Sequence, residues 1–468
     1  MQDFMDSDES QTSIPIEAIT ELFSSMSVSP YTDAAVDTEL KKVNLFEDYA
    51  IKYAISLISS SSSNQLLGAR IIRRLLTKEN EIPYEKVIQS NVLPCLIQLI
   101  PSLDEQFAYE VLWIISNLAV GEEYCIDYLL SQRSLELLNF ILENCKSIEI
   151  FSQVMWAIGN IAGTNHSYRD TVIQQLNIDK IAYFLYAHER EFSTTDYQNI
   201  AWSIHNLVSN KLPPDLNKIK LFIPFLQKII INQEDQWVLE DALSSYSIIT
   251  DKYSDLDSSF NSQLLAKFCS LLDHQSRKIN VSCLKNIGNY ATQKIDQDFV
   301  IKSGLFPKLI SFIDSSDKMI RKEAYWVMSN LVLDSNIYFS YLINSNFFEK
   351  FRKTLENDSV DVIKEAVWVI CNFAVVSDFD QAKWLIDNMI IDLILEKLLI
   401  NATIGDVIFD GLLNYFKFDN ILEIKEISRY LETLENAKIH IGNNDNLKLE
   451  KVLQRLNEMK NCTDFAME

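Results

Sequence analysis

Tryptophan and asparagine recur together in this sequence, four positions apart, in five similar segments. The segments read VLWIISNLA, VMWAIGNIA, IAWSIHNLV, AYWVMSNLV and AVWVICNFA, and they begin at Val111, Val154, Ile200, Ala324 and Ala366. Residues four apart lie on one face of an α-helix. Indole rings attract cations and cover the apolar stems of Lys and Arg, and carboxamides bind the N–H and C=O groups of a peptide backbone. The pairing predicts binding of an extended, basic peptide.

A purely structural role is the alternative interpretation of each pair. A lone Trp on a packed helix is usually part of the core, and a lone Asn usually bonds to nearby backbone. Five pairs in one register favour binding, because an Asn without a partner on a packed face costs about 1–3 kcal/mol.

Residues that could perform catalysis are scattered along the chain. The histidines show no Ser/His/Asp, Cys/His or metal-ligand spacing, and they are His166, His188, His205, His274 and His440. Only 9 Gly and 9 Pro occur, and there is no G-x-G-x-x-G segment or P-loop. We therefore expect no enzymatic activity, no metal and no cofactor.

The spacing of the tryptophans defines a repeat. Neighbouring copies are 43, 46 and 42 residues apart, and the interval between Trp202 and Trp326 has room for two more. These two begin at Ala242 and Cys283, with Ser244 or Lys285 in the Trp position and Ile248 or Asn289 in the Asn position. From about residue 45 apolar residues recur at helical spacing, and a period of roughly 40–47 residues is typical of armadillo or HEAT repeats. The sequence predicts an all-α fold, a right-handed armadillo-repeat superhelical solenoid of about ten three-helix repeats.

The scarcity of glycine requires another residue at the helix ends. Asn91, Asn177 and Asn346 stand where a glycine would normally end the preceding helix. Because Asn tolerates the left-handed conformation better than most residues, we expect these three to adopt it.

The balance of acidic and basic residues limits the classes of molecule that the protein can bind. Lys and Arg total 42 against 65 Asp and Glu, a net charge of −23, which disfavours nucleic acid and anionic membranes as ligands. The acidity serves either solubility alone or the attraction of basic partners, and composition does not choose between the two. No uninterrupted apolar run approaches the roughly 18 residues of a membrane span. The seven cysteines are scattered and predict reduced core thiols of an intracellular protein, and the acidic N-terminus does not resemble a secretion signal.

Several longer segments resemble importin-α, the armadillo-repeat adaptor family of nuclear import. They are QLLGARIIRRLLTKE from Gln65, QVMWAIGNIAGTNHSYRD from Gln153, KEAYWVMSN from Lys322, KEAVWVICN from Lys364 and, like that family's last repeat, LKLEKVLQRLN from Leu447. The resemblance covers roughly residues 45–460. It implies a monomeric adaptor that shuttles between cytoplasm and nucleus and binds basic nuclear localisation signals of cargo proteins. It also implies importin-β and an export receptor as partners.

The resemblance implies two peptide-binding sites. The major site corresponds to Trp113, Asn117, Gly121, Gln153, Trp156, Asn160, Thr164, Trp202 and Asn206. The minor site corresponds to Lys285, Asn289, Glu323, Trp326, Asn330, Glu365, Trp368 and Asn372. Thr164 stands where the family has an Asp that receives a lysine, so we expect a weakened major site and an unusually large contribution from the minor one.

The predicted domains are an acidic, mostly disordered arm at 1–44, the solenoid at 45–460 and a short tail at 461–468. The last repeat, about 402–460, would form the C-terminal cap. The arm lacks the Arg/Lys-rich segment with which the family binds importin-β. The rival hypothesis is therefore a non-transport armadillo scaffold that binds a protein partner through its acidic surface.

Overall fold

The structure is a computed structural model that describes residues 47–60, 62–77, 81–102, 105–210, 212–252, 262–292, 296–400, 404–438 and 446–465. The predicted arm at 1–44 lies outside these residues. Within the described ranges every regular element is a helix, which confirms the predicted all-α armadillo solenoid.

Within the described ranges the helices form ten successive groups, in agreement with the predicted number of repeats. The first four groups are α3 (Glu47–Ile58) and α4 (Ser62–Leu75); α5 (Tyr84–Gln89), α6 (Val92–Leu99), η1 (Ile100–Ser102) and α7 (Glu105–Ala119); α8 (Glu123–Ser131), α9 (Ser134–Asn144) and α10 (Ile148–Thr164); and α11 (His166–Gln175), α12 (Ile178–Ala187) and α13 (Thr194–Val208). The fifth group is α14 (Leu216–Ile219), η2 (Lys220–Phe222), α15 (Ile223–Asn232) and α16 (Gln236–Lys252).

The remaining groups follow the same order. They are α17 (Ser262–Leu271) and α18 (Arg277–Ala291); α19 (Gln297–Lys302), α20 (Leu305–Phe312) and α21 (Lys318–Asp334); η3 (Asn336–Tyr338), α22 (Phe339–Ile343), α23 (Phe347–Asn357) and α24 (Val360–Val376); α25 (Phe379–Asp387), α26 (Ile390–Ile400) and α27 (Gly405–Tyr415); and α28 (Ile424–Lys438) and α29 (Asn446–Phe465).

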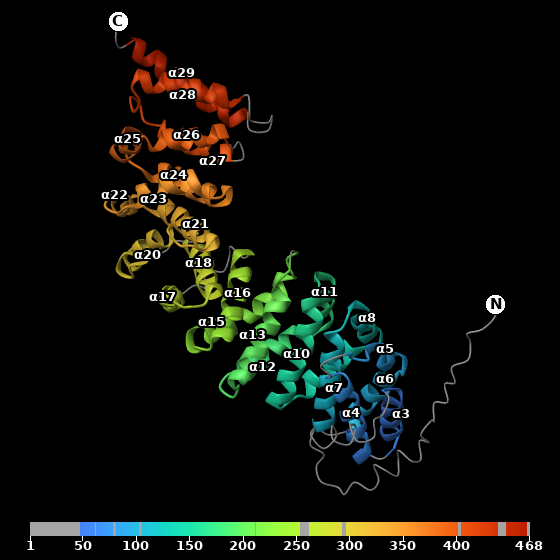
Figure 1. Ribbon diagram of the computed structural model, residues 1–468. Coiled ribbons are helices and arrows are strands. Elements are labelled where there is room, and N and C mark those ends of the chain that lie inside the picture. The colour runs from blue at the N-terminus through green and yellow to red at the C-terminus, as the bar shows by residue number, and fades with distance from the viewer. Residues whose placement is uncertain are drawn as a thin grey trace, which may run out of the picture. The chain divides into compact units, whose positions relative to one another are not determined.

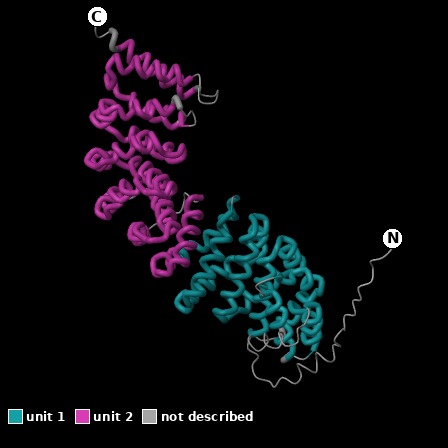
Figure 2. Tube along the Cα trace, viewed as in Figure 1, with its two compact units in different colours: residues 1–226 teal, residues 227–468 magenta. Residues whose placement is uncertain are grey.

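The chain divides into two compact units, a boundary that sequence analysis did not indicate. Unit 1 is Met1–Leu226 and unit 2 is Gln227–Glu468, as Figure 2 shows. In unit 1 the last helix of each repeat packs on that of the next, in the order α4, α7, α10 and α13 (Figure 1). In unit 2 the corresponding order is α16, α18, α21, α24 and α27. The tryptophan and asparagine residues of the repeat all lie on these stacked helices.

Burial of the apolar faces holds the stack together. On α10, for example, Phe151, Val154, Met155, Ile158 and Ile161 are completely buried. Each such side chain contributes about 1.5–3 kcal/mol when it is removed from water. Trp156 and Asn160 lie on the side of the same helix that remains partly accessible to solvent.

The left-handed caps agree with prediction at only one of the three asparagines. Asn91 has φ of 52°, as expected. Asn177 and Asn346 have φ of −79° and −85°, so the prediction was wrong for both. The side chain of Asn177 instead accepts a hydrogen bond from the backbone N–H of Lys180, which makes it an ordinary N-cap.

Long basic side chains replace glycine at several helix ends. Lys218 donates to Ile173 O at 2.6 Å, Lys350 to Ile310 O at 2.9 Å and Lys417 to Ala374 O at 3.1 Å. The ammonium groups satisfy C-terminal carbonyls and oppose the negative end of the helix dipole. These three helices thus have terminal carbonyls satisfied by a lysine rather than by a glycine cap.

The cysteines are all free thiols, but they are not all in the core. Cys125, Cys283 and Cys371 are buried as predicted, whereas Cys95 and Cys462 are exposed. Among the described residues no helix has the length and apolarity needed to cross a membrane.

Candidate functional site

Unit 1 presents three Trp/Asn pairs on the stacked helices α7, α10 and α13. Trp113 and Trp202 are half-buried, and Trp156 is 37% exposed. No ring contact joins these three indoles within the described part of the chain. Trp156 is the most accessible of the three rings, whereas Tyr109 and Arg73 of the same chain already contact the ring of Trp113.

The asparagines form a ladder of hydrogen bonds between repeats. Asn160 Nδ2 donates to Ser116 O at 3.1 Å, and Asn206 Nδ2 donates to Gly159 O at 3.1 Å. The accepting carbonyl belongs in each case to the residue just before the previous repeat's asparagine. We call this bond the inter-repeat clasp.

The clasp supplies a partner that the sequence analysis had expected a bound peptide to provide. Asn160 and Asn206 are not left without a partner, because one N–H group of each bonds to the preceding repeat. The second N–H and the carbonyl oxygen of the half-buried Asn160 and Asn206 take no part in the clasp, so each residue combines a structural bond with spare polar atoms. Asn117 has no clasp, and its Nδ2 atom has no hydrogen-bond partner among the described residues.

Small residues allow the indoles to seat on the preceding helix. A Cβ added at Gly159 would lie 2.5 Å from Cζ3 of Trp202. A Cβ at Gly163 would lie 3.0 Å from Nδ2 of Asn206. The two glycines of α10 thus admit the tryptophan and the asparagine of the next repeat.

The other predicted residues of the major site differ in accessibility. Gln153 is only 4% exposed, and its Nε2 donates to Ser116 Oγ at 3.3 Å, so its amide serves the packing of the fold. Thr164 is exposed, and its hydroxyl donates to Asn160 O at 3.3 Å. Gly121 follows α7, where a Cβ would lie 2.7 Å from Cys125 Sγ.

Unit 2 repeats the arrangement on α18, α21 and α24. Asn330 Nδ2 donates to Gly288 O at 3.2 Å, and Asn372 Nδ2 donates to Ser329 O at 3.1 Å. Trp326 and Trp368 are half-buried, like Trp113 and Trp202. The clasp is therefore a property of both units.

Asn289 keeps the clasp, with Ser247 O as the acceptor, and adds a second bond. Its Nδ2 donates both to Ser247 O at 2.9 Å and to Thr250 Oγ1 at 2.9 Å. The residue is 7% exposed. Both of its N–H groups are used within the fold, so it has no donor left for a ligand.

The predicted acidic residues of the minor site are poorly placed to receive a cation. Glu323 is 5% exposed, and burial raises the pKa of its carboxyl, an effect that the nearby Lys322 and Lys285 oppose. Burial also raises the pKa of Glu365, against the influence of Lys322. Lysines of the same chain therefore already interact electrostatically with both carboxyls.

Sequence analysis missed the residue that covers the first indole. Arg73 lies on α4, and its guanidinium stands 4.3 Å from the centroid of the Trp113 ring. It also bonds to Glu110 through Nε at 2.5 Å and is almost completely buried. Arg73 precedes Ser116 by 43 residues, and Ser116 precedes Gly159 by 43 residues. Because Gly159 contacts the tryptophan of the following repeat, the repeat spacing alone could have placed Arg73 beside Trp113.

The other missed position lies on α27. Tyr415 follows Asn372 by one repeat, and its hydroxyl donates to Ile370 O at 2.5 Å. Tyr415 is buried, so a tyrosine supplies the inter-repeat bond where the Asn motif ends.

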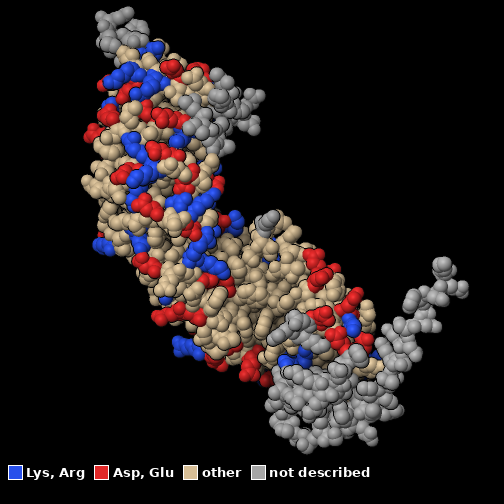
Figure 3. All heavy atoms as spheres, in the orientation of Figure 1, with Lys and Arg blue, Asp and Glu red and all other residues tan. Residues whose placement is uncertain are grey.

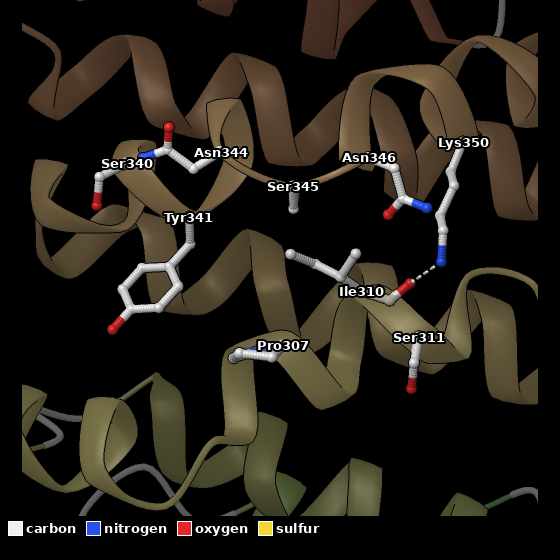
Figure 4. A pocket seen from close by; sticks show the side chains of 9 residues that line it. All are labelled: Pro307, Ile310, Ser311, Ser340, Tyr341, Asn344, Ser345, Asn346 and Lys350. Atoms are coloured by element: carbon white, nitrogen blue, oxygen red, sulfur yellow. Dashed lines mark hydrogen bonds between the residues drawn. The ribbon is translucent and has the colours of Figure 1, made fainter.

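Among the described residues, the charged patches and the pocket outside the Trp/Asn helices show no repeated pattern of side chains like the Trp/Asn pairs. The face in Figure 3 shows acidic side chains gathered at one end of unit 1 and mixed basic and acidic side chains over unit 2. Figure 4 shows a pocket between α20, α22 and α23, where Lys350 already bonds to Ile310 O. No group of three metal-ligating side chains occurs in the described ranges.

Known proteins resemble this chain in its repeats, including two that carry Trp/Asn helices. The armadillo/β-catenin-like repeat family matches residues 80–120 and 296–333. Importin subunit alpha-1b of Oryza sativa subsp. japonica is 26% identical over 272 residues, which cover 57% of this chain and 50% of the relative. Importin subunit alpha-3 of Arabidopsis thaliana is 23% identical over 294 residues, which cover 62% and 54%. The chain is an armadillo-repeat protein with distant similarity to importin subunits alpha.

The likeness has clear limits. The chain spans about half the length of the curated relatives that it matches. Its backbone is similar to the crystal structure of an engineered protein, with a TM-score of 0.69 and 18% identity over 88% of this chain and 99% of that one. This last similarity supports the fold alone.

Proposed function

We propose that this protein binds extended, lysine- and arginine-rich peptides along the Trp/Asn helices of unit 1. The observation that carries the proposal is the series of three partly exposed indoles, each one turn before an asparagine. Peptide Lys or Arg stems would lie against the indoles, and each cation–π contact would contribute about 0.5–2 kcal/mol. The spare polar atoms of Asn160 and Asn206 would bond to the peptide backbone.

The role that follows from this binding is that of a nuclear import adaptor. Its ligands would be the nuclear localisation signals of cargo proteins, and the protein would move between cytoplasm and nucleus. The names of the importin subunit alpha relatives support this role, as does the recurrence of the Trp/Asn motif in five repeats. Importin-β and an export receptor would be its other partners, and nucleic acid and membranes would not bind.

A non-transport scaffold is the second candidate, and one specific observation favours it. The inter-repeat clasp gives each asparagine a structural purpose that does not require a peptide. On that hypothesis the Trp/Asn motif persists because it packs the repeats, and a protein partner would bind through the acidic surface.

The two candidates differ in how basic peptides respond to Trp156. We would titrate a fluorescent lysine-rich peptide, and the same peptide with its lysines replaced by alanine, into the full chain by anisotropy. Trp156→Ala should weaken the lysine-rich peptide by about 2- to 30-fold, the loss of one cation–π contact. Trp237→Ala is the matched control, because Trp237 is 63% exposed but lies on α16 outside the Trp/Asn register.

Equal binding of both peptides would reject the adaptor hypothesis. So would equal effects of the two tryptophan substitutions. Either result would leave the scaffold as the better account.

A further inference from the structure

A hollow of about 420 Å³ lies between α6 and α9 of unit 1, two helices that carry no Trp/Asn pair. We call it the α6/α9 hollow, and its apolar lining consists of Pro94, Ile97, Pro101, Leu137 and Phe140. Phe140 is 41% exposed. Among the described residues, the charged side chains that line it are Arg133 and Glu136, which pair with each other, Nε to Oε1 at 2.8 Å. The α6/α9 hollow therefore suits apolar side chains rather than a charged group.

Unit 2 has a hollow at the same place in the repeat, and its chemistry differs. Ile310 of that hollow follows Ile97 by 213 residues, and at the same offset Lys350 corresponds to Leu137. Lys350 bonds to Ile310 O across that hollow, as Figure 4 shows. The α6/α9 hollow thus has an apolar side chain where its counterpart has an ammonium group.

The apolar surface beside the α6/α9 hollow continues on the next repeat. Tyr183 of α12 follows Phe140 by 43 residues, and α12 packs on α9. Tyr183 is 67% exposed. Adjacent exposed aromatic side chains beside an apolar hollow are typical of a surface that binds another segment of protein.

The chain enters the fold close to this surface. α3 begins at Glu47, and Lys86 of α5 pairs with Glu47 at 3.1 Å and with Asp48 at 3.4 Å. α3 also packs on α6, which lines the α6/α9 hollow. A single helix, about 10–12 Å across, therefore lies between the first described helix and the hollow.

The arm that precedes α3 contains a strongly apolar segment, IPIEAITELF at residues 14–23, which lies outside the described residues. Ile16, Ile19 and Phe23 have the i, i+3, i+7 spacing of one helix face, and the two glutamates of the segment fall on the opposite side. This is the spacing with which an amphipathic helix places its apolar side chains in a groove.

We propose that residues 14–23 bind the α6/α9 hollow as an amphipathic helix, with the apolar face against Ile97, Leu137 and Phe140. The arm is then held on unit 1 away from the Trp/Asn helices α7, α10 and α13, which stay open to a peptide. The proposal does not depend on peptide binding, because none of the residues involved belongs to a Trp/Asn pair.

The connection between the segment and the fold favours this occupant over an unconnected partner. Phe23 and Glu47 are separated by 23 residues, and an extended chain of that length spans up to about 75 Å, several helix diameters. Short linkers hold a segment at an effective concentration on the order of 1 mM. An intrinsic Kd of about 0.1 mM would then keep about nine molecules in ten in the bound form.

Hydrogen-exchange mass spectrometry on the full chain tests the contact. The amides of residues 16–23 should exchange about tenfold more slowly in the wild type than in the Ile19→Asp protein, which carries a charge on the apolar face of the segment. Phe140→Asp should abolish this protection. Phe140→Lys should do the same, because it gives the hollow the residue that Lys353 supplies at the equivalent position of unit 2.

A matched substitution and an internal reference control the experiment. Phe379→Asp should leave the protection unchanged, because Phe379 is also 41% exposed but lies on α25 of unit 2. The amides of α10 report in the same spectra that unit 1 remains folded in every variant.

Each of four results would overturn the proposal. Exchange of residues 16–23 at the rate of an unstructured peptide would show that they make no stable contact. Protection that survives Phe140→Asp would place the segment elsewhere on the chain. Protection that rises with protein concentration would assign the segment to the hollow of a second copy, and protection lost on addition of a lysine-rich peptide would place it on the Trp/Asn helices.

Discussion

Gly288→Ala tests whether the indoles are seated on the preceding repeat as the structure indicates. The new Cβ would lie 2.0 Å from Cζ3, 2.4 Å from Cε3 and 2.6 Å from Cη2 of Trp326. Carbon atoms in contact normally stand about 3.5–4.0 Å apart, so the ring has to move by more than about 1 Å. The same movement disturbs the clasp from Asn330 to Gly288 O.

The expected loss follows from opposing contributions. Replacement of Gly by Ala inside a helix stabilises it by about 1 kcal/mol. Overpacking costs about 1–3 kcal/mol, and the weakened hydrogen bond costs about 1 kcal/mol more. The net change should be a destabilisation of about 1–3 kcal/mol.

Urea unfolding followed by circular dichroism measures this change. Ser329→Ala is the matched control, since Ser329 holds the same position one repeat later and already has a Cβ. Its hydroxyl donates to Trp326 O within its own helix, so its loss should cost only about 0.5–1 kcal/mol. A Gly288→Ala protein more stable than wild type would show helix propensity acting alone and would refute the seating of Trp326.

Three further predictions concern charge and the two faces. Burial raises the pKa of Asp241 to about 6, so the folded state binds its proton more tightly than the unfolded state, and stability falls as pH rises from about 4 through 6. Asp241→Asn should remove about 1–2 kcal/mol of this fall, and identical pH profiles of unfolding would contradict it. Arg73→Ala should destabilise the chain by about 2 kcal/mol in urea unfolding, because it removes one of the two arginines that bond to the buried Glu110 and uncovers the indole of Trp113, while Arg70 still bonds to Glu110; a loss below about 1 kcal/mol would contradict this prediction. For an all-lysine peptide, Trp156→Ala should weaken binding more than Trp326→Ala does, since lysines accompany the acids of unit 2, and the reverse order would restore the expectation drawn from Thr164.

The repeat architecture was predictable because its signal is periodic. Trp and Asn at a fixed spacing located five of the stacked helices, and the same spacing located the copies at Ser244 and Lys285. A helix face is defined by spacing alone, so the sequence placed both residues of each pair on one side. The structure places them there.

The partners of those residues were not predictable in the same way. The clasp from Asn160 to Ser116 joins residues 44 apart, and a local pattern states which face a residue occupies but not which carbonyl it meets. Asn289 looked like its counterparts, yet its second bond depends on Thr250, outside the motif. The prediction of a left-handed conformation was wrong for Asn177 and Asn346 because Asn also occurs in several other turn and cap conformations.

The central claim is that peptide lysines lie against the indoles of unit 1, and a double-mutant cycle tests it most directly. The cycle pairs Trp156→Ala with replacement of each peptide lysine in turn by norleucine, which keeps most of the stem and removes the charge. The account predicts a coupling of about 0.5–2 kcal/mol for one lysine and a dependence of affinity on salt. Zero coupling for every lysine, with affinity retained by the Trp156→Ala protein, would contradict it.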